Sequence, residues 1–169
     1  RILWAIRSSL FMGALSIALS CIVGGLLGAI AGYYGGKLDN VIMRIMDVFL
    51  AIPSMLLAIA IVAAFGTSLV NVLLAIGISY VPTFARTVRA PILTVKGQEY
   101  IEAAKAVGAS DFRIIFKYIL PNSMAPIIVQ VTLGVAGAIL SIAGLSFLGL
   151  GIQPPTPEWG AMLSGARSY

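Results

Sequence analysis

Residues 97–121, GQEYIEAAKAVGASDFRIIFKYILP, form the long polar interruption of an otherwise strongly apolar chain. They include three of the six acidic and three of the eleven basic residues of the chain: Glu99, Glu102, Lys105, Asp111, Arg113 and Lys117. A charge at the centre of a bilayer costs about 2.5–3.5 kcal/mol even on insertion scales. This segment must therefore lie in water or against another protein, between the apolar segments that precede and follow it.

The composition of the chain is that of an integral membrane protein. Of its 169 residues, 60% are hydrophobic and only 10% are charged, whereas roughly 25% of the residues of soluble domains are charged, and the mean hydropathy is +1.04. A net charge of +5 is also found in nucleic-acid-binding proteins, but here the basic residues lie in short segments between apolar runs, as membrane topology requires. We therefore expect a lipid bilayer around the chain and no nucleic acid as a partner.

Residue types that are missing from the sequence disfavour hydrolytic and metal chemistry. The chain has no histidine and a single cysteine, Cys21, so it offers no disulfide framework and no zinc or Ser-His site. We expect no catalytic residues, no metal and no cofactor bound by this chain. Because the first residue is Arg1 and no signal-peptide pattern precedes a mature domain, we expect an internal piece of a longer protein.

Residues 8–34 predict the first transmembrane helix. They carry no charge over 27 positions, and about 20 residues at 1.5 Å each cross a hydrocarbon core of about 30 Å. Gly24, Gly28 and Gly32 recur at a spacing of four on one face. This spacing either lets another helix approach closely or reflects only the general glycine content of membrane helices.

Residues 41–65 predict a second span, with polar residues in its first turns. Arg44 and Asp47 are three apart, so they share a helix face and either neutralise each other near the membrane interface or form a snorkelling pair with only a packing role. Pro53 removes a backbone hydrogen bond inside the span, so we expect a kink there. Such a kink either shapes a transport cavity or serves packing, and the sequence leaves both open.

Residues 69–85 predict a third span, at the short end of the permitted range. Arg86 and Arg89 follow directly and place the end of the span at one membrane face. A proline disfavours helical continuation, and a Lys-Gly pair favours a turn. We therefore expect Pro91 and the Lys96-Gly97 pair to end the helical run.

Residues 124–150 predict a fourth, uncharged span, and residues 151–169 predict a loop. Gly134 and Ala138 provide a pair of small residues at a spacing of four, which favours helix packing. Gln130 is one of the few polar groups in the first half of this span and could line a pathway. The final loop is rich in proline and glycine, with Trp159 as an expected interfacial anchor.

The distribution of Lys and Arg predicts the orientation. Loops on one side of the four spans hold eight basic residues: Lys37, Arg44, Arg86, Arg89, Lys96, Lys105, Arg113 and Lys117. The other side holds three: Arg1, Arg7 and Arg167. The positive-inside rule then places residues 97–121 in the cytoplasm and residues 151–169 outside it.

Within residues 97–121, apolar residues at mixed spacings of three and four predict an amphipathic helical hairpin. Gly108 is the expected end of the first helix, and Ser110 is the expected N-cap of the second. The first helix carries alanines that would let a partner approach closely: Ala103, Ala104, Ala106 and Ala109. Spacing alone fits equally well a helix that lies passively on the membrane.

The motif EAAKAVG followed by YILP, in residues Glu102-Ala103-Ala104, Gly108 and Leu120-Pro121, closely resembles the EAA loop of ABC importer permeases. Three further segments resemble the dipeptide, oligopeptide and nickel branch of that family: RIMDVFLAIPSMLLAIAI, PTFARTVRAPIL and LSFLGLGIQPPTPEWGAML. The resemblance covers essentially the whole chain. Tyr118 departs from the general pattern, which has Ile at that position.

The resemblance implies an all-α polytopic helix bundle of the MetI-like permease fold, a single permease domain over residues 1–169. It implies six spans in the full-length protein, of which this fragment would lack the first span, the segment after it and the last span. The loop would couple to an ATPase through nine residues: Glu102, Ala103, Ala104, Lys105, Val107, Gly108, Ala109, Leu120 and Pro121. Four residues are candidates for a pathway or a hinge: Arg44, Asp47, Pro53 and Gln130.

The resemblance also implies partners: a homologous second permease subunit, two cytoplasmic ATP-binding subunits and an extracytoplasmic substrate-binding protein, in a bacterial or archaeal cytoplasmic membrane. The chain contains no GxxxxGK[ST] motif, so ATP is expected on the partner subunit. Dipeptides, longer peptides, nickel chelates and glutathione are the substrates of similar permeases.

Two other functions are alternatives to ATP-driven import. A secondary transporter driven by an ion gradient needs buried acidic residues near the middle of the membrane, and Asp47, with Arg44 beside it, is the one candidate. A membrane enzyme needs convergent nucleophile, acid and base groups. The lack of histidine and of clustered cysteines argues against it.

Overall fold

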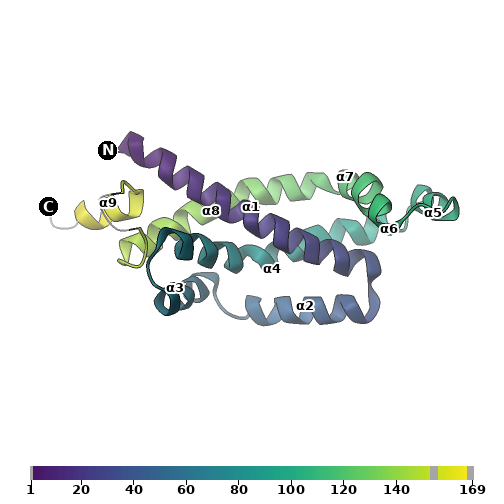
Figure 1. The fold of residues 1–169 in the computed structure, drawn as a ribbon, viewed down its shortest axis with the longest axis horizontal. Coiled ribbons are helices and arrows are strands. Elements are labelled where there is room, and N and C mark those ends of the chain that lie inside the picture. The colour runs from purple at the N-terminus through teal and green to yellow at the C-terminus, as the bar shows by residue number, and fades with distance from the viewer. Residues whose placement is uncertain (1, 153–155, 167–169) are drawn as a thin grey trace.

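The computed structural model describes residues 2–152 and 156–166, and every regular element in these ranges is a helix. The elements in order are α1 (Ile2–Tyr34), α2 (Gly36–Leu50), α3 (Ser54–Phe65), α4 (Leu69–Val95), α5 (Glu99–Ala106), α6 (Asp111–Arg113), the π-helix η1 (Ile114–Ile119), α7 (Leu120–Asn122), α8 (Met124–Phe147) and α9 (Trp159–Ala166). Figure 1 shows an elongated bundle in which α1, α4 and α8 run along the long axis. We call its two ends the α5 end and the α9 end.

Three helices of the described chain are long and apolar enough to cross a membrane: α1, α4 and α8. The second predicted span, residues 41–65, is instead a bent pair of helices, α2 and α3, which meet at an angle of 83°. The pair is a fourth span only if both helices belong to one broken span. The kink expected at Pro53 is present as a break between two helices, sharper than a kink within one helix. Pro53, with ψ of 128°, lies at the break, because its ring and missing N–H disrupt a helix at this point.

Helix α4 continues past the predicted span and past Pro91, and it ends at the Lys96-Gly97 pair, as the sequence predicted. The predicted span stops at residue 85, but the helix reaches Val95 and includes Pro91. Pro91 was expected to end the helix; it does not, because the last turns are held by packing, with Val88 at 1% and Ile92 at 0% exposed. Tertiary contacts thus outweigh the lost backbone hydrogen bond.

The two ends of the chain also depart from the expected boundaries. Helix α1 begins at Ile2 and includes Arg7, which the sequence places in a loop. The sequence predicts a loop over residues 151–169, but this segment contains the eight-residue helix α9. Residues 1, 153–155 and 167–169, among them Arg1 and Arg167, lie outside the described residues.

Helix α1 packs closely against α4 through its small residues. A Cβ atom added at Gly24 or Gly28 would collide with the α4 backbone at Val81 and Ala85. Ser20 Oγ donates a hydrogen bond of 2.6 Å to the carbonyl oxygen of Gly77, so a polar group joins the same interface. The glycine spacing therefore brings two helix backbones together, as one reading of the sequence predicted.

Helix α8 completes the central packing. Gly134 faces Ile17 of α1, and Gly137 faces the Tyr80 hydroxyl of α4, while Ala138 is 0% exposed. The small residues of the predicted fourth span thus lie at helix contacts, as expected. Thr132 donates to the carbonyl oxygen of Ile128 on its own helix, so it satisfies its hydroxyl locally.

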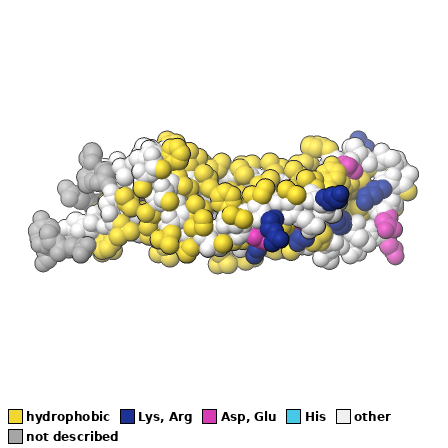
Figure 2. All heavy atoms as spheres, turned by 90° about the horizontal axis from the view of Figure 1, so that it is seen from below, with side chains coloured by type: hydrophobic (Ala, Val, Ile, Leu, Met, Phe, Trp, Pro, Cys, Tyr) yellow, Lys and Arg dark blue, Asp and Glu magenta, His cyan; other side chains and the backbone are white. Residues whose placement is uncertain are grey.

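Polar and apolar side chains separate along the bundle. Figure 2 shows hydrophobic side chains over most of the visible face and the charged ones concentrated in the half that contains the α5 end. At the opposite end, Glu158 is 0% exposed. One of its oxygens accepts a hydrogen bond of 2.9 Å from the Ala161 N–H at the start of α9. The concentration of charged side chains near one end of the bundle is what is required when the middle of the bundle lies in hydrocarbon.

We predict that Gly28→Ala lowers the stability of the full-length protein by about 1–3 kcal/mol, because the added methyl group overpacks the α1–α4 contact. Gly25→Ala is the matched control on the same helix, since its Cβ would lie an ordinary 3.8 Å from Val88. Thermal unfolding in detergent measures both variants. Equal melting temperatures for the two variants would contradict the close-approach role of Gly28.

Candidate functional site

The candidate site is the helical hairpin at the α5 end, made of residues 97–121, which we call the EAA loop. Helix α5 buries one face: Ile101 is 0% and Ala104 is 8% exposed. These two residues pack in one apolar cluster with Ile92 of α4 and with Ile114 and Ile119 of the returning arm. The opposite face, which includes Glu102, Ala103 and Lys105, is exposed. The hairpin is therefore docked onto the bundle rather than lying free.

Gly108 ends α5 with a left-handed turn. Its φ of +79° favours glycine, because an L-residue with a Cβ is strained there. The Gly108 N–H donates to the Lys105 carbonyl and the Ala109 N–H to the Ala104 carbonyl, at 2.9 and 3.1 Å. This pair of bonds is a Schellman motif. The sequence prediction that the first helix ends at Gly108 is confirmed.

Ser110 begins the returning arm as an N-cap, also as predicted: its Oγ accepts from the Arg113 N–H at 3.4 Å. The arm then continues through α6 into the π-helix η1, which the sequence did not predict. Asn122 Nδ2 donates to the Tyr118 carbonyl and Ser123 Oγ donates to the Ile119 carbonyl, at 2.6 and 2.9 Å. These side chains satisfy carbonyl groups where the helix changes its hydrogen-bond register.

The residues of the sequence motif share one hairpin but differ in exposure. Leu120 is half-buried against the apolar cluster, and Pro121 is exposed within α7. Val107, at the turn beside Gly108, is 84% exposed. A Cβ atom added at Gly108 would have no other atom within 4 Å. Figure 1 places α5 at the extreme end of the molecule. Val107 and Gly108 thus form an exposed turn at this end of the bundle.

A polar contact that the sequence analysis missed ties the EAA loop to α1. The Asp111 carboxylate accepts hydrogen bonds from the Tyr33 and Tyr34 hydroxyls, at 2.6 and 3.3 Å. The Lys105 ammonium lies 5.6 Å from the centre of the Tyr33 ring, within cation–π range. No sequence signal pairs Tyr33 with a residue 78 positions away.

Two ion pairs join α2 to α4, and neither is the one that the sequence suggested. Asp47 binds Arg86 at 2.5 Å, whereas Arg44 is exposed and, in the part of the chain that the structure describes, has no carboxylate partner. The expected pairing of Arg44 with Asp47 was therefore wrong, because α4 places a second arginine beside Asp47. Asp39 accepts two hydrogen bonds from Arg89, both at 2.6 Å.

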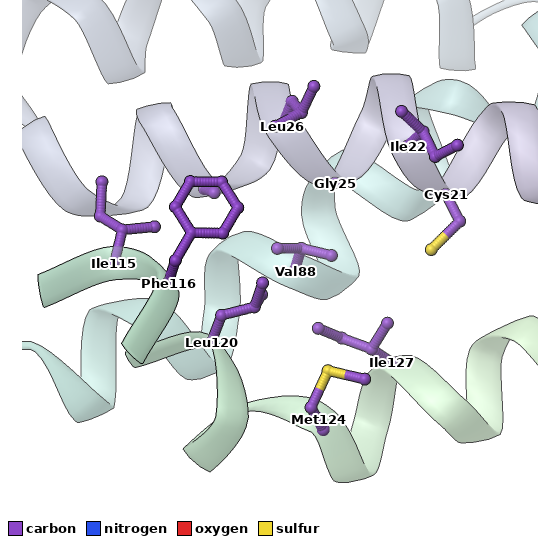
Figure 3. A pocket seen from close by; sticks show the side chains of 11 residues that line it. Cys21, Ile22, Gly25, Leu26, Val88, Ile115, Phe116, Leu120, Met124 and Ile127 are labelled. Carbon is purple, nitrogen blue, oxygen red and sulfur yellow. The ribbon is translucent and has the colours of Figure 1, made fainter. Parts of the chain in front are cut away.

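The four candidates for a pathway or hinge are not brought together around the cavity that the structure contains near the EAA loop. This cavity has a volume of about 310 Å³ and lies between α1 on one side and η1, α7 and α8 on the other (Figure 3). Its lining is almost wholly apolar and includes Phe116, Met124 and Cys21. Arg44, Asp47, Pro53 and Gln130 are not among the lining residues.

In residues 2–152 and 156–166, no group of His, Cys, Asp or Glu could hold a metal ion.

Residues 24–167 match the family model described as "Binding-protein-dependent transport system inner membrane component". The chain belongs to this family. The matched region begins at Gly24, in the glycine face of α1, and includes the whole EAA loop. The resemblance noted in the sequence is therefore a true family relationship, and the family is that of the membrane component rather than of the ATPase.

Curated relatives of the family match the chain over all or nearly all of its length. A dipeptide transport system permease protein of Alkalihalophilus pseudofirmus is 54% identical over all 169 residues, and one of Haemophilus influenzae is 47% identical over the same length. A glutathione transport system permease protein of Pectobacterium atrosepticum is 49% identical over 99% of the chain. The chain spans 56–57% of the length of these relatives.

We predict that the two ion pairs between α2 and α4 differ in their contribution to stability. The side chains of Arg89 and Asp39 are 31% and 11% exposed, against 55% and 46% for Arg86 and Asp47. Asp39→Asn should destabilise the full-length protein by about 2 kcal/mol or more, because it leaves a partly buried guanidinium unpaired. Asp47→Asn should cost at most about 1 kcal/mol.

Chemical unfolding of both variants in the same detergent tests the difference. Double-mutant cycles with Arg89→Gln and Arg86→Gln separate the pair energies from the effect of each single change. An equal or larger loss for Asp47→Asn would contradict the ranking by burial.

Proposed function

We propose that this chain is the membrane-spanning part of an ATP-driven importer, and that its EAA loop receives the mechanical work of a cytoplasmic ATPase. The observation that carries the proposal is the exposed turn of Val107 and Gly108 at the far end of a hairpin that is packed onto the bundle. A partner that grips the turn moves α4 and α8 directly, because the hairpin connects these two helices in the chain.

The contact with the ATPase is assigned to the EAA loop. Glu102, Ala103 and Lys105 lie on the exposed face of α5, and Val107, Gly108 and Ala109 form the turn. Ala104 and Leu120 pack in the apolar cluster that holds the hairpin together, and Pro121 lies exposed in α7. A surface of small side chains lets a cleft in the partner close tightly around the helix. Because the sequence has no nucleotide-binding GxxxxGK[ST] motif, ATP is bound and hydrolysed by that partner.

The orientation follows from the charges. The eight basic residues predicted for one side lie in α2, the second half of α4, the turn that follows it and the EAA loop, so the positive-inside rule places the α5 end in the cytoplasm. The α9 end then faces outward, where a substrate-binding protein delivers its cargo. The location is the cytoplasmic membrane of a bacterium or an archaeon.

The complete subunit has the six-span MetI-like permease fold in this proposal. The relatives are nearly twice as long as the chain, which leaves room for the additional spans. Large apolar side chains are exposed along the described helices, such as Leu133 at 65% and Leu140 at 75% on α8. Lipid, the missing spans and a homologous second permease subunit would cover these surfaces, and two ATP-binding subunits complete the transporter.

The substrate class is short peptides. This choice rests on the names of the relatives, which are permeases for dipeptides and for glutathione, itself a small peptide; nickel chelates are the alternative cargo. We assign Pro53, at the break between α2 and α3, to a hinge of the pathway. Arg44, Asp47 and Gln130 are the polar groups that we assign to the pathway or its hinge.

The alternative, transport driven by an ion gradient, requires a carboxylate available in the middle of the membrane. Asp47 is paired with Arg86 and half exposed, and Glu158 lies beside α9 at one end of the bundle. Neither residue meets the requirement. If the full-length transporter purified without an ATPase and accumulated substrate on an ion gradient alone, the proposal would be wrong.

We predict that Gly108→Trp uncouples ATP hydrolysis from uptake while membrane insertion stays intact. The indole would occupy the open space at the turn and block a closely fitting partner. Uptake by proteoliposomes that contain the complete transporter should fall at least about tenfold, as expected when a tightly packed contact is prevented.

Gly149→Trp is the matched control for backbone strain. Gly149 has a φ of +80° and nothing within 4 Å of its Cβ position, nearly the same as Gly108, but it follows α8 at the opposite end. The control variant should keep its ratio of uptake to ATP hydrolysis. Equal uncoupling in both variants would assign the effect to strain and not to docking.

A further inference from the structure

The EAA loop has a polar contact to α1 besides its two covalent connections and its apolar packing. Asp111 is the first residue of α6, immediately after the Gly108 turn, and its two carboxylate oxygens accept from Tyr33 and Tyr34 at 2.6 and 3.3 Å. Phenol donors to a charged carboxylate form the stronger class of hydrogen bond. The shorter bond, from Tyr33, is in the range of such charge-assisted contacts.

Other groups hold the same end of α1 in position. Lys96, which follows α4, donates to the Gly32 carbonyl at 2.7 Å and so caps the last turn of α1. The rings of Tyr33 and Tyr34 contact each other edge to face, with centroids 5.1 Å apart. Tyr33 also packs against the apolar cluster that contains Ile101 and Ile114. Asp111 thus meets a pair of hydroxyls that are already oriented.

Helix α5 is connected to the rest of the chain by a turn at each end. Before α5, the chain turns through residues 96–98, which include Gly97, and after α5 it turns at Gly108, the residue type with the most conformational freedom. The apolar packing of Ile101 and Ala104 holds one face of α5, but rotation about these two turns remains the motion that a pulling partner would cause. The Asp111 contact lies just beyond Gly108, where it limits that rotation.

From this geometry we propose that Asp111 is a positioning residue of the transport cycle: through Tyr33 and Tyr34 it makes α1 move together with the EAA loop. The inference rests on the proposed function, since it needs a partner that moves the loop. Helix α1 has 33 residues, a length of about 50 Å, and at its other end the Ile2 carbonyl accepts from Trp159 Nε1 of α9 at 3.4 Å. Motion at Asp111 therefore reaches the opposite end of the bundle through one continuous helix.

The first test removes single polar groups and keeps the shape of each side chain. Tyr33→Phe, Asp111→Asn and the double variant are placed in the full-length subunit of the complete transporter in proteoliposomes, and uptake per ATP hydrolysed is measured. Each single variant should lower this ratio by about three- to tenfold, the range expected when one charge-assisted hydrogen bond is lost. The double variant should be no worse than the more affected single one.

Tyr118→Phe is the matched control. It removes a hydroxyl from a half-buried tyrosine of the same loop, and in the described residues that hydroxyl makes no hydrogen bond. Its ratio of uptake to hydrolysis should equal that of the wild type. A normal ratio in both Tyr33→Phe and Asp111→Asn, or additive losses in the double variant, would overturn the inference.

The second test measures whether α1 and the loop move as one body. Spin labels at Ile30 of α1 and Phe112 of the loop, which are 37% and 71% exposed, report the distance between them with and without bound nucleotide. In the wild type the distance should be the same in both states, and in Tyr33→Phe it should change with nucleotide. A distance that changes in the wild type, or one that stays constant in Tyr33→Phe, would contradict joint motion.

Gly108→Trp separates failure of this inference from failure of the proposed function. If Gly108→Trp uncouples but Tyr33→Phe and Asp111→Asn transport normally, the loop docks on an ATPase and α1 does not depend on Asp111. If Gly108→Trp itself transports normally, the docking role of the loop is wrong, and the inference is lost with it.

Discussion

The close contact between the backbones of α1 and α4 is the constraint on which the rest of the bundle depends. It is possible only because glycines recur every fourth residue along α1, so that the backbone of α4 fills the space where side chains would otherwise stand. In hydrocarbon, where apolar burial provides no driving force between helices, such van der Waals contact and a few hydrogen bonds like that of Ser20 hold helices together. Helix α8 then packs on this pair, and the ion pairs of Asp39 and Asp47 attach α2 to it.

The EAA loop extends this rigid unit beyond the apolar part of the bundle. Its buried face, centred on Ile101, continues the apolar packing of α4, while its exposed face ends at Val107. Three kinds of attachment act together here: covalent connection to α4 and α8, apolar packing, and the hydrogen bonds of Asp111 to α1. A force applied at one exposed turn is thereby distributed over three long helices rather than one.

Local features of the sequence were predictable, and features that depend on distant residues were not. The end of α5 at Gly108, the N-cap at Ser110 and the glycine face of α1 all follow from spacing and backbone preference, which act within a few residues. The pairing of Asp47 with Arg86, the contact of Asp111 with Tyr33 and the continuation of α4 through Pro91 depend on which helices become neighbours. The angle between α2 and α3 is of the same kind: Pro53 predicts a disturbance, but packing decides whether it becomes a gentle kink or a turn of 83°.

The π-helix between the EAA loop and α8 has a consequence for the tolerance of the chain to changes in length. Its hydrogen bonds close over one more residue than those of an α-helix, so it accommodates an extra residue without rotating the helix that follows. Gly134 and Ala138 of α8 must face α1, and a one-residue insertion in a continuous α-helix would turn them away by about 100°. Residues 114–119 can therefore absorb a change in the length of the EAA loop without turning Gly134 and Ala138 away from α1.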